Sequence, residues 1–254
     1  MSNIQLTKLA NLIKSFFAHF NMRKWGVIQE AYFISKFDAP FSISYAQGAE
    51  DLVFLNLIKN KSKGFYIDIG AHDPNRFSVT RRLYHLGWRG INVDANSEIE
   101  SKFRYFRPKD IFISAAVGST SNYTFHKFQE SAINTSSEDW KYRFAKEGNT
   151  LIESINVIGI SLFEIFSLVQ ENVEIDLLNI DIEGSDFEAL QSAKFDNLPK
   201  QKLPNWIILE TPLSVREVLS FPAIMYLQNF GYEIICVLPM STILKKIASR
   251  GDRI

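Results

Sequence analysis

The sequence predicts an α/β fold with a mostly parallel sheet, helices on both faces and an antiparallel hairpin at the C-terminal end. Short apolar runs alternate with segments of helical periodicity, which indicates buried parallel strands joined by helices. The last two expected strands, residues 232–238 and about 241–247, are separated only by Pro239 and Met240. Because so short a link cannot hold a crossover, these two strands must be antiparallel.

Composition and charge fit a globular protein with a full core. The 254 residues are 46% hydrophobic, and 28 basic residues balance 28 acidic ones. A balanced charge gives no overall field that would attract nucleic acid. The sequence has no apolar stretch of 18 or more residues and no convincing signal cleavage site, so we expect a cytoplasmic protein without a transmembrane segment.

Residues 1–40 are expected to form a helical extension ahead of a main domain at residues 41–254. Apolar residues recur at three- and four-residue steps between positions 4 and 20, on one helical face. Two alternatives fit this helix. It can pack on protein, as a lid or as the arm of a homo-oligomer, or it can lie on a membrane surface. Packing on protein is the commoner fate of such a helix and is favoured.

The main domain divides into strands, helices and one long loop. The expected strands are residues 65–69, 90–94, 111–117, 175–180 and 206–210, ahead of the hairpin. The expected helices are residues 47–60, about 79–86, 97–107, about 161–169, a segment from about 185, and 214–231. Capping boxes are expected at Ser97/Glu100, Ser161/Glu164 and Ser214/Glu217. Residues 119–150 are polar and without clear periodicity, which predicts an irregular loop, either functional or a disordered surface insertion.

A glycine-containing loop follows the first strand directly, with the sequence Asp-Ile-Gly-Ala-His-Asp at positions 68–73. In open α/β sheets, ligands bind outside the carboxyl ends of the strands, and Gly70 would let the backbone approach a ligand closely. A dinucleotide enzyme would need G-x-G-x-x-G around a pyrophosphate. The single glycine, followed by acidic residues, better suits a cationic ligand such as S-adenosylmethionine. Alone, the loop fits an ordinary turn equally well.

Acidic residues also end three later strands. Asp94 lies 26 residues after Asp68, where a carboxylate can accept both hydroxyls of a ribose, a role shared with NAD enzymes. Its alternative role is a charge near the start of the following helix. Asp181 and Glu210 end two further strands. Acidic strand ends that converge on one crevice indicate a site rather than surface decoration.

Four segments in order resemble the FkbM-type methyltransferases over residues 45–247. They are residues 45–51 (YAQGAED), 65–72 (FYIDIGAH), 87–94 (GWRGINVD) and 180–184 (IDIEG). The resemblance implies a Rossmann-like class I methyltransferase sheet and S-adenosylmethionine-dependent O-methylation of a sugar or another hydroxylated metabolite in glycan or natural-product assembly. Residues 73–76 (DPNR) depart from the glycine-rich turn of many members, and Ala95-Asn96 replaces a common proline.

The resemblance also implies roles for particular residues. Those expected to bind the cofactor are Asp68, Gly70, Ala71, Asp94, Ala116 and Asp181, with Asp181 near its methionine end. Apart from the resemblance, Asn134 is expected at the acceptor because the polar 119–150 loop follows the third strand on the same edge as the acidic strand ends, and Gln47 is expected there too. The expected partner is a small-molecule or glycan acceptor.

A hydroxyl is a poor nucleophile until its proton leaves, so a catalytic base is expected. The candidates are Glu183, His72 and Glu210, each at or just after a strand end. Glu183 is preferred because it can reach past Asp181 toward the acceptor, although it can instead fix the next helix. His72 titrates near neutrality but can serve only to shape its loop. The acidic residues could also gather around magnesium, yet such carboxylates more often accept hydrogen bonds, so no metal is expected.

Rival classes fit the sequence less well. A nucleic-acid amino-methyltransferase would carry a [DNS]-P-P-[YFW] segment where this chain has Asp-Ile-Glu-Gly, so no nucleic-acid partner is expected. An NAD-type dehydrogenase would carry the glycine fingerprint that is missing here. A non-catalytic or nucleotide-binding Rossmann-like domain stays an open alternative, because a fold can persist without its chemistry.

Overall fold

The computed structural model describes residues 42–59, 61–212 and 214–247. The expected N-terminal helix lies outside these ranges. The chain divides after Ser44 into two units, and the features below belong to the second, Tyr45–Ile254. No helix within the described ranges is both long and apolar enough to cross a membrane.

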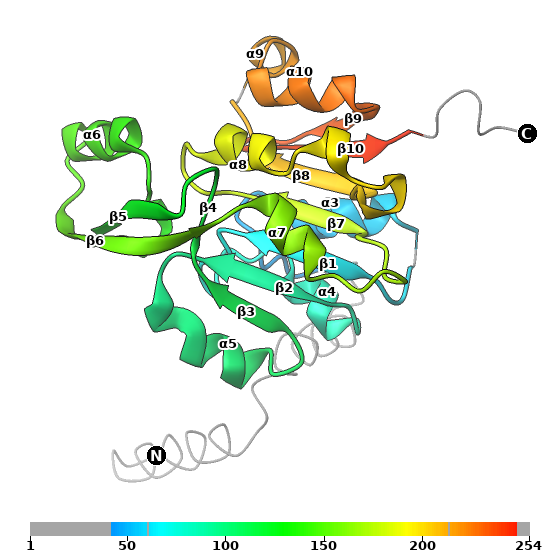
Figure 1. The fold of residues 1–254 in the computed structure, drawn as a ribbon, viewed down its shortest axis with the longest axis horizontal. Helices are drawn as coiled ribbons and strands as arrows, with labels where there is room; N and C mark the ends of the chain where they lie inside the picture. The colour runs from blue at the N-terminus through cyan, green and yellow to red at the C-terminus, as the bar shows by residue number, and fades with distance from the viewer. Residues whose placement is uncertain (1–41, 60, 213, 248–254) are drawn as a thin grey trace, which may run out of the picture. The chain divides into compact units, whose positions relative to one another are not determined.

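Seven described strands form the main sheet, in the order β3-β2-β1-β7-β8-β10-β9 (Figure 1). They are β1 (Phe65–Ile69), β2 (Arg89–Asp94), β3 (Ile111–Ser114), β7 (Leu177–Ile180), β8 (Trp206–Glu210), β9 (Tyr232–Val237) and β10 (Ser241–Lys246). Strand β10 is antiparallel to both of its neighbours, and the other pairings are parallel. The predicted parallel sheet with a C-terminal antiparallel hairpin is therefore confirmed.

Helices cover both faces of this sheet, as predicted. They are α3 (Glu50–Leu57), α4 (Arg81–His85), η2 (Ser97–Ile99), α5 (Glu100–Phe106), α7 (Leu162–Ser167), α8 (Asp186–Ser192), η4 (Phe195–Asn197), η5 (Lys200–Lys202), α9 (Val215–Leu219) and α10 (Pro222–Asn229). Successive residues of β7 point to opposite faces. Leu177 joins the cluster of Phe54 from α3, whereas Leu178 joins Ile165 from α7 and Ile224 from α10.

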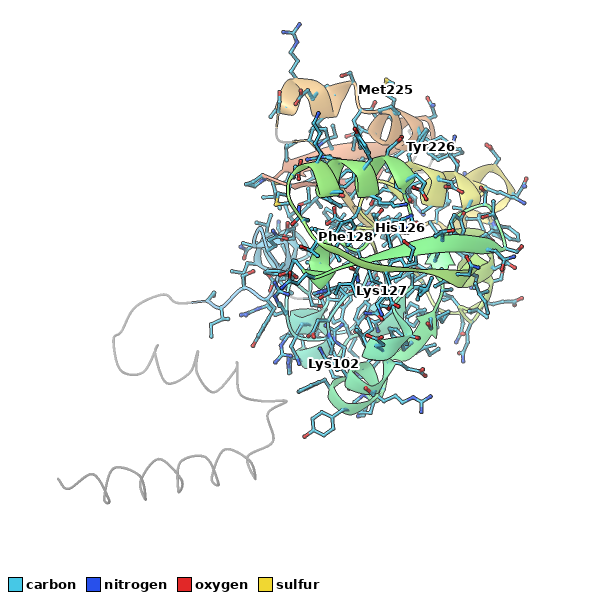
Figure 2. All side chains as sticks on the ribbon, turned by 90° about the vertical axis from the view of Figure 1, so that its left-hand side faces the viewer. Lys102, His126, Lys127, Phe128, Met225 and Tyr226 are labelled. Carbon is cyan, nitrogen blue, oxygen red and sulfur yellow. The ribbon has the colours of Figure 1, made fainter. Side chains whose placement is uncertain are left out.

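A second, smaller sheet is inserted between β3 and α7. It contains β4 (Ala116–Val117), β5 (Asn122–Phe128) and β6 (Leu151–Ile160) in the order β4-β6-β5, with η3 (Ser131–Ile133) and α6 (Glu138–Lys146) between β5 and β6. In Figure 1 the insertion lies to one side of the main sheet, and in Figure 2 α6 lies above β5. The rings of Phe128 and Phe144 join β5 to α6 at 5.7 Å between centroids.

Two expectations about this region are wrong. Residues 119–150 are not an irregular loop, and residues 111–117 are two strands rather than one. The sheet escapes sequence reasoning because the first four residues of β6 are all exposed, and the alternation that follows runs only between exposed and half-buried side chains. Backbone pairing along β5 and β6 stabilises it instead, with a few aromatic side chains on the inner side.

The helix starts agree with prediction in part. The capping box of Ser161 and Glu164 is present. The capping box predicted at Ser97 is wrong, because the side chain of Asn96 caps η2 by accepting from the Glu98 amide. Ser214 makes no side-chain cap, and the helix expected over residues 214–231 breaks into α9 and α10. Pro222 starts α10, since a proline lacks the N–H that a continuous helix would use.

A buried polar network holds the loop after β1. The Arg107 side chain is 2% exposed and donates to Thr80 Oγ1 at 2.7 Å and to the carbonyl of Pro74 at 2.8 Å. Thr80 in turn donates to the buried carboxylate of Asp68, which also accepts from Asn179 Nδ2 at 2.8 Å. The cation thus compensates the buried carboxylate and fixes the loop.

We predict that Arg107→Met lowers the free energy of unfolding by about 3 to 5 kcal/mol, because it leaves a buried carboxylate and several acceptors without their cation. Urea unfolding followed by circular dichroism measures this change. Arg104→Met, on the exposed side of α5 and three residues before Arg107, is the matched control and should cost no more than about 0.5 kcal/mol. Equal losses in the two variants would contradict the role of the network.

Candidate functional site

The carboxyl ends of β1, β2, β7 and β8 meet at the switch point of the sheet, where the chain leaves β1 toward β2 on one side and β7 lies on the other. Gly70 follows β1 with φ +78°, a conformation that favours glycine. A Cβ at this position would lie 1.7 Å from the carbonyl oxygen of Asp181. The loops after β1 and β7 therefore touch backbone to backbone.

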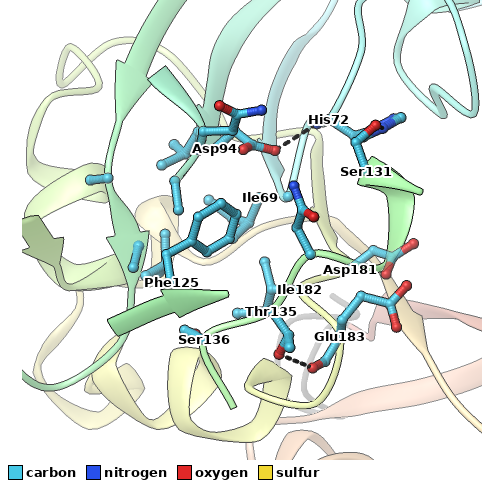
Figure 3. A pocket seen from close by; sticks show the side chains of 18 of the residues that line it. Ile69, His72, Asp94, Phe125, Ser131, Thr135, Ser136, Asp181, Ile182 and Glu183 are labelled. Atoms are coloured by element: carbon cyan, nitrogen blue, oxygen red, sulfur yellow. Dashed lines mark hydrogen bonds between the residues drawn. The ribbon is translucent and has the colours of Figure 1, made fainter. Parts of the chain in front are cut away.

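A first cavity of about 590 Å³ of empty space, partly open to solvent, lies at this point (Figure 3). Residues that the sequence predicted gather in its lining: Gly70, His72, Asp94, Ala116, Asn134, Asp181 and Glu183. Ile69, Val117 and Phe125 give it apolar walls. In Figure 3, Asp94 and Phe125 lie across the cavity from Asp181 and Glu183.

The Asp94 carboxylate is anchored by backbone amides. Its Oδ2 atom accepts from the amide of His72 at 2.8 Å, and its Oδ1 atom accepts from the amide of Asn96 at 2.7 Å. Burial raises the pKa of Asp94 to about 6. A carboxylate has about four lone-pair positions, so Asp94 can accept further hydrogen bonds from a ligand.

A second cavity, of about 710 Å³ of empty space, adjoins the first. Gly70, His72, Ala132, Asp181 and Glu183 line both. The second cavity is completed by residues from α3, from the loop after β1 and from the ends of β8 and β10, including Gln47, Glu50, Phe77, Glu210 and Met240. The two cavities therefore share part of their lining, which we call their common wall, and two ligands, one in each cavity, would lie next to each other there.

Carboxyl groups crowd this wall. Burial, together with Asp186 and Glu50, raises the pKa of Asp181 to about 7, although its side chain is accessible from the cavities. Burial and the carboxyl of Asp181 raise the pKa of Glu183 to about 8. Burial and the carboxyl groups of Asp181, Asp186 and Glu183 raise the pKa of Glu210 to about 10. The cluster favours a cation, which would lower all three pKa values.

The insertion holds the loop that carries Glu183. Thr135 Oγ1 donates to the carbonyl of Glu183 at 2.7 Å, and Glu183 itself has φ +54°. Asp186 accepts from the amides of Ile182 and Gly184, each at 3.2 Å. A Cβ on Gly184, where φ is +99°, would lie 2.1 Å from Cδ1 of Trp140. The glycine thus admits the indole of α6 against the loop.

His72 is also tied to the insertion. Its Nε2 atom lies 3.0 Å from Ser131 Oγ, and its ring stacks on Phe77. Arg76, four residues later, makes a bidentate ion pair with Glu130 at 3.0 Å. Burial lowers the pKa of His72. These contacts fit the loop-shaping role that the sequence left open for His72.

The other predicted residues divide between these cavities and the protein interior. Gln47 lines the second cavity, and Glu210 lies there too. Asp68 and Ala71 line neither cavity, since Asp68 is buried between Thr80 and Asn179, and the amide of Ala71 donates to Val93. Asn134 lines the first cavity, not the second, and its Oδ1 atom accepts from the amide of Phe128.

Sequence reasoning missed several lining residues. Phe125, Ser131 and Ala132 come from the insertion, whose strands were not foreseen. The alternating aromatic residues Tyr123 and Phe125 are typical of a strand, and this pattern could have identified Phe125. Glu50 lay within a matching segment but was not singled out. Among the described residues, no three His, Cys, Asp or Glu side chains are arranged to hold a metal ion.

Comparison with known proteins assigns a family to this arrangement. A family model described as the methyltransferase FkbM domain matches residues 68–234. The chain belongs to this family. The predicted recognition is therefore confirmed, and with it the Rossmann-like methyltransferase fold and S-adenosylmethionine-dependent methyl transfer in general. A search of curated proteins finds no match.

Solved structures of other methyltransferases are similar to this FkbM-family chain at low identity. One is a precorrin-6y C5,15-methyltransferase from Geobacter metallireducens GS-15, 14% identical, with a TM-score of 0.43, over 84% of this chain and 96% of that one. Another is the human methyltransferase 10 domain containing protein, 11% identical, with a TM-score of 0.40, over 86% of this chain and 92% of that one.

The carboxyl cluster predicts a stability that falls with pH. The folded-state pKa of Glu210, about 10, lies above its unfolded value, so its contribution to stability is complete below about pH 4 and is lost as the pH rises toward 10. Within that window the slope for one titrating carboxyl is at most about 1.4 kcal/mol per pH unit, and solvent screening reduces it for these partly exposed side chains. We predict that Glu210→Gln makes the decline between pH 5 and 9 shallower, as measured by urea unfolding.

The matched control is Glu217→Gln, an exposed residue of α9 outside the cavities. It should leave the pH dependence as it is in the parent protein. An unchanged slope in Glu210→Gln would show that Glu210 does not titrate in the way its surroundings imply.

Proposed function

We propose that this FkbM-family protein transfers the methyl group of S-adenosylmethionine to a hydroxyl of a sugar or related metabolite. The cofactor would occupy the first cavity and the reacting hydroxyl the second. The observation that carries the proposal is their common wall, where Gly70, Asp181 and Glu183 line both cavities. Methyl transfer needs two ligands in contact, and adjacent cavities that share lining residues can hold them so.

The lining of the first cavity fits the cofactor. Asp94 offers carboxylate oxygens for ribose hydroxyls, and Val117 and Phe125 offer apolar surface for a base. On the opposite side of the cavity, Asp181 and Glu183 suit a sulfonium or an ammonium group, because a cation stabilises the ionised form of a neighbouring carboxylate. When bound, the cofactor supplies an electrophilic methyl group.

Glu183 fits the role of base better than its rivals. A base is most effective when its pKa lies near the working pH, and burial raises the pKa of Glu183 to about 8. A neighbouring cation would bring that value closer to neutrality. Glu210, with a pKa of about 10, stays protonated and suits a hydrogen-bond donor to the acceptor. His72 has a lowered pKa and is already engaged with Ser131.

Asp94→Ala should weaken binding of S-adenosylhomocysteine by about 2 to 4 kcal/mol, since it removes charge-assisted hydrogen bonds to ribose. Isothermal titration calorimetry measures this. Glu98→Ala is the control, because Glu98 is exposed and pairs with Lys127 outside both cavities. Unchanged affinity in a folded Asp94→Ala protein would exclude the ribose role. NAD binding in place of S-adenosylhomocysteine would instead favour a dehydrogenase.

Glu183→Gln should bind the cofactor normally and lower the single-turnover methylation rate at least about tenfold, within the range for losing a general base. The acceptor for this measurement comes from a mass-spectrometric screen of glycosides, glycans and nucleotide sugars. In the parent protein the rate should rise with pH and level off below about pH 8, because the deprotonated carboxylate is the active form and the bound cationic cofactor lowers its pKa.

Glu188→Gln serves as the matched control, since Glu188 bonds Ser119 and Tyr123 away from the two cavities. Its cofactor affinity and methylation rate should match those of the parent. A normal rate in Glu183→Gln would make Glu183 structural and pass the role of base to His72 or Glu210.

A further inference from the structure

An apolar groove lies beyond the second cavity, between α6 of the insertion and the ends of β8, α10 and the β9–β10 hairpin. Trp140, Phe187, Phe221, Met240, Pro212 and Pro222 line it, and we call it the aromatic groove. It holds about 1210 Å³ of empty space, including space open to solvent. The proposed reaction assigns no role to it so far.

The aromatic groove adjoins the second cavity. Glu210 and Met240 line both, so a molecule whose hydroxyl lies beside Glu183 can extend past Glu210 into the groove. The rest of an acceptor larger than one sugar ring must leave the second cavity by some opening. The groove is such an opening, and its own lining residues can contact the part of the acceptor that leaves the cavity.

Packing fixes the walls of the groove. The Trp140 indole meets the Phe144 ring edge-on at 5.3 Å between centroids, and Gly184 lacks the side chain that would displace it. The Phe187 ring meets Tyr226 edge-on at 5.8 Å. These aromatic side chains are held in place before a ligand arrives, which lowers the entropic cost of binding an apolar group.

The charges of the groove argue against an anionic ligand. Arg143 is the one cation among the described residues that line it, and its Nε atom already donates to Glu147 at 3.0 Å. Two lining residues carry carboxyl groups and add no positive charge: Asp186, which accepts from two backbone amides, and Glu210, which is protonated. A phosphate would need several cationic or amide donors and would face these carboxyl groups without them.

We infer that the aromatic groove binds an apolar substituent of the acceptor, and that the acceptor is an uncharged sugar or related polyol carrying an alkyl or aryl group. The inference rests on the proposed function, since it assigns the reacting hydroxyl to the second cavity. Nucleotide sugars are excluded as acceptors by the same reasoning. The apolar substituent supplies binding energy, and the sugar presents its hydroxyl to Glu183.

Calorimetric titration of the full chain, saturated with S-adenosylhomocysteine, tests this inference. The probes are methyl, butyl and octyl β-glucoside below their micelle concentrations, with UDP-glucose as the charged probe. Affinity should rise with chain length, at least about tenfold from methyl to octyl, because each buried methylene adds to binding. UDP-glucose should bind no more tightly than methyl β-glucoside.

Two variants locate the effect. Trp140→Ala and Phe221→Ala, from opposite walls of the groove, should each reduce the chain-length gain at least about threefold. Tyr142→Ala is the matched control, because Tyr142 lies on the same helix as Trp140 and is 73% exposed outside the groove. Unchanged S-adenosylhomocysteine affinity shows that a variant is folded.

Each outcome bears on one proposal. Equal affinity for the three glucosides, tighter binding of UDP-glucose, or a gain that persists in both groove variants would overturn the inference. Failure of the parent protein to bind S-adenosylhomocysteine would instead count against the proposed function. That titration is made before any glucoside is added, so the two failures are distinguishable.

Discussion

The contact between the backbone of Gly70 and the carbonyl of Asp181 is the constraint on which the site depends. Parallel strands bring their carboxyl ends together, but side chains normally keep the following loops apart. Here a missing side chain lets the two loops touch, and the same few residues then line both cavities. The buried side chain of Arg107 also fixes the loop after β1, because it donates a hydrogen bond to the carbonyl of Pro74. The distance between the two loops is thus set by backbone atoms, which cannot change rotamer.

The electrostatics of the site follow from this closeness. Asp181, Glu183 and Glu210 lie close together around the two cavities, and their mutual repulsion disfavours several negative charges there without a cation. Without a ligand, protonation relieves the repulsion. A cationic ligand would replace the protons, so the cluster favours a sulfonium or an ammonium over a phosphate. Glu210 also lines the aromatic groove, whose described lining offers an anion a single cation, Arg143.

The sequence predicts the parts of the molecule whose pattern is local. Strands such as β1 and β7 are short, mostly apolar runs, which made the sheet predictable. Acidic residues end β2 and β8 and directly follow β7, which made the acidic crevice predictable. The insertion could not be predicted in this way, because β6 is largely exposed and α6 is a polar helix oriented by Trp140 and Phe144. Asp68 shows a different limit. Motif position alone suggests a ligand contact, but its strand register places it opposite Asn179, inside the protein.

The insertion begins and ends at one place. Strand β4 pairs in parallel with the end of β6, Ala116 beside Gly159 and Val117 beside Ile160, so the chain leaves the main sheet and returns to it at neighbouring positions. Segments with adjacent ends can be lengthened, shortened or exchanged with little effect on the domain that carries them. This one contributes Phe125 and Ala132 to the cavities and Trp140 to the groove. Recombination at these two crossing points would therefore give one methyl-transfer sheet many acceptor preferences.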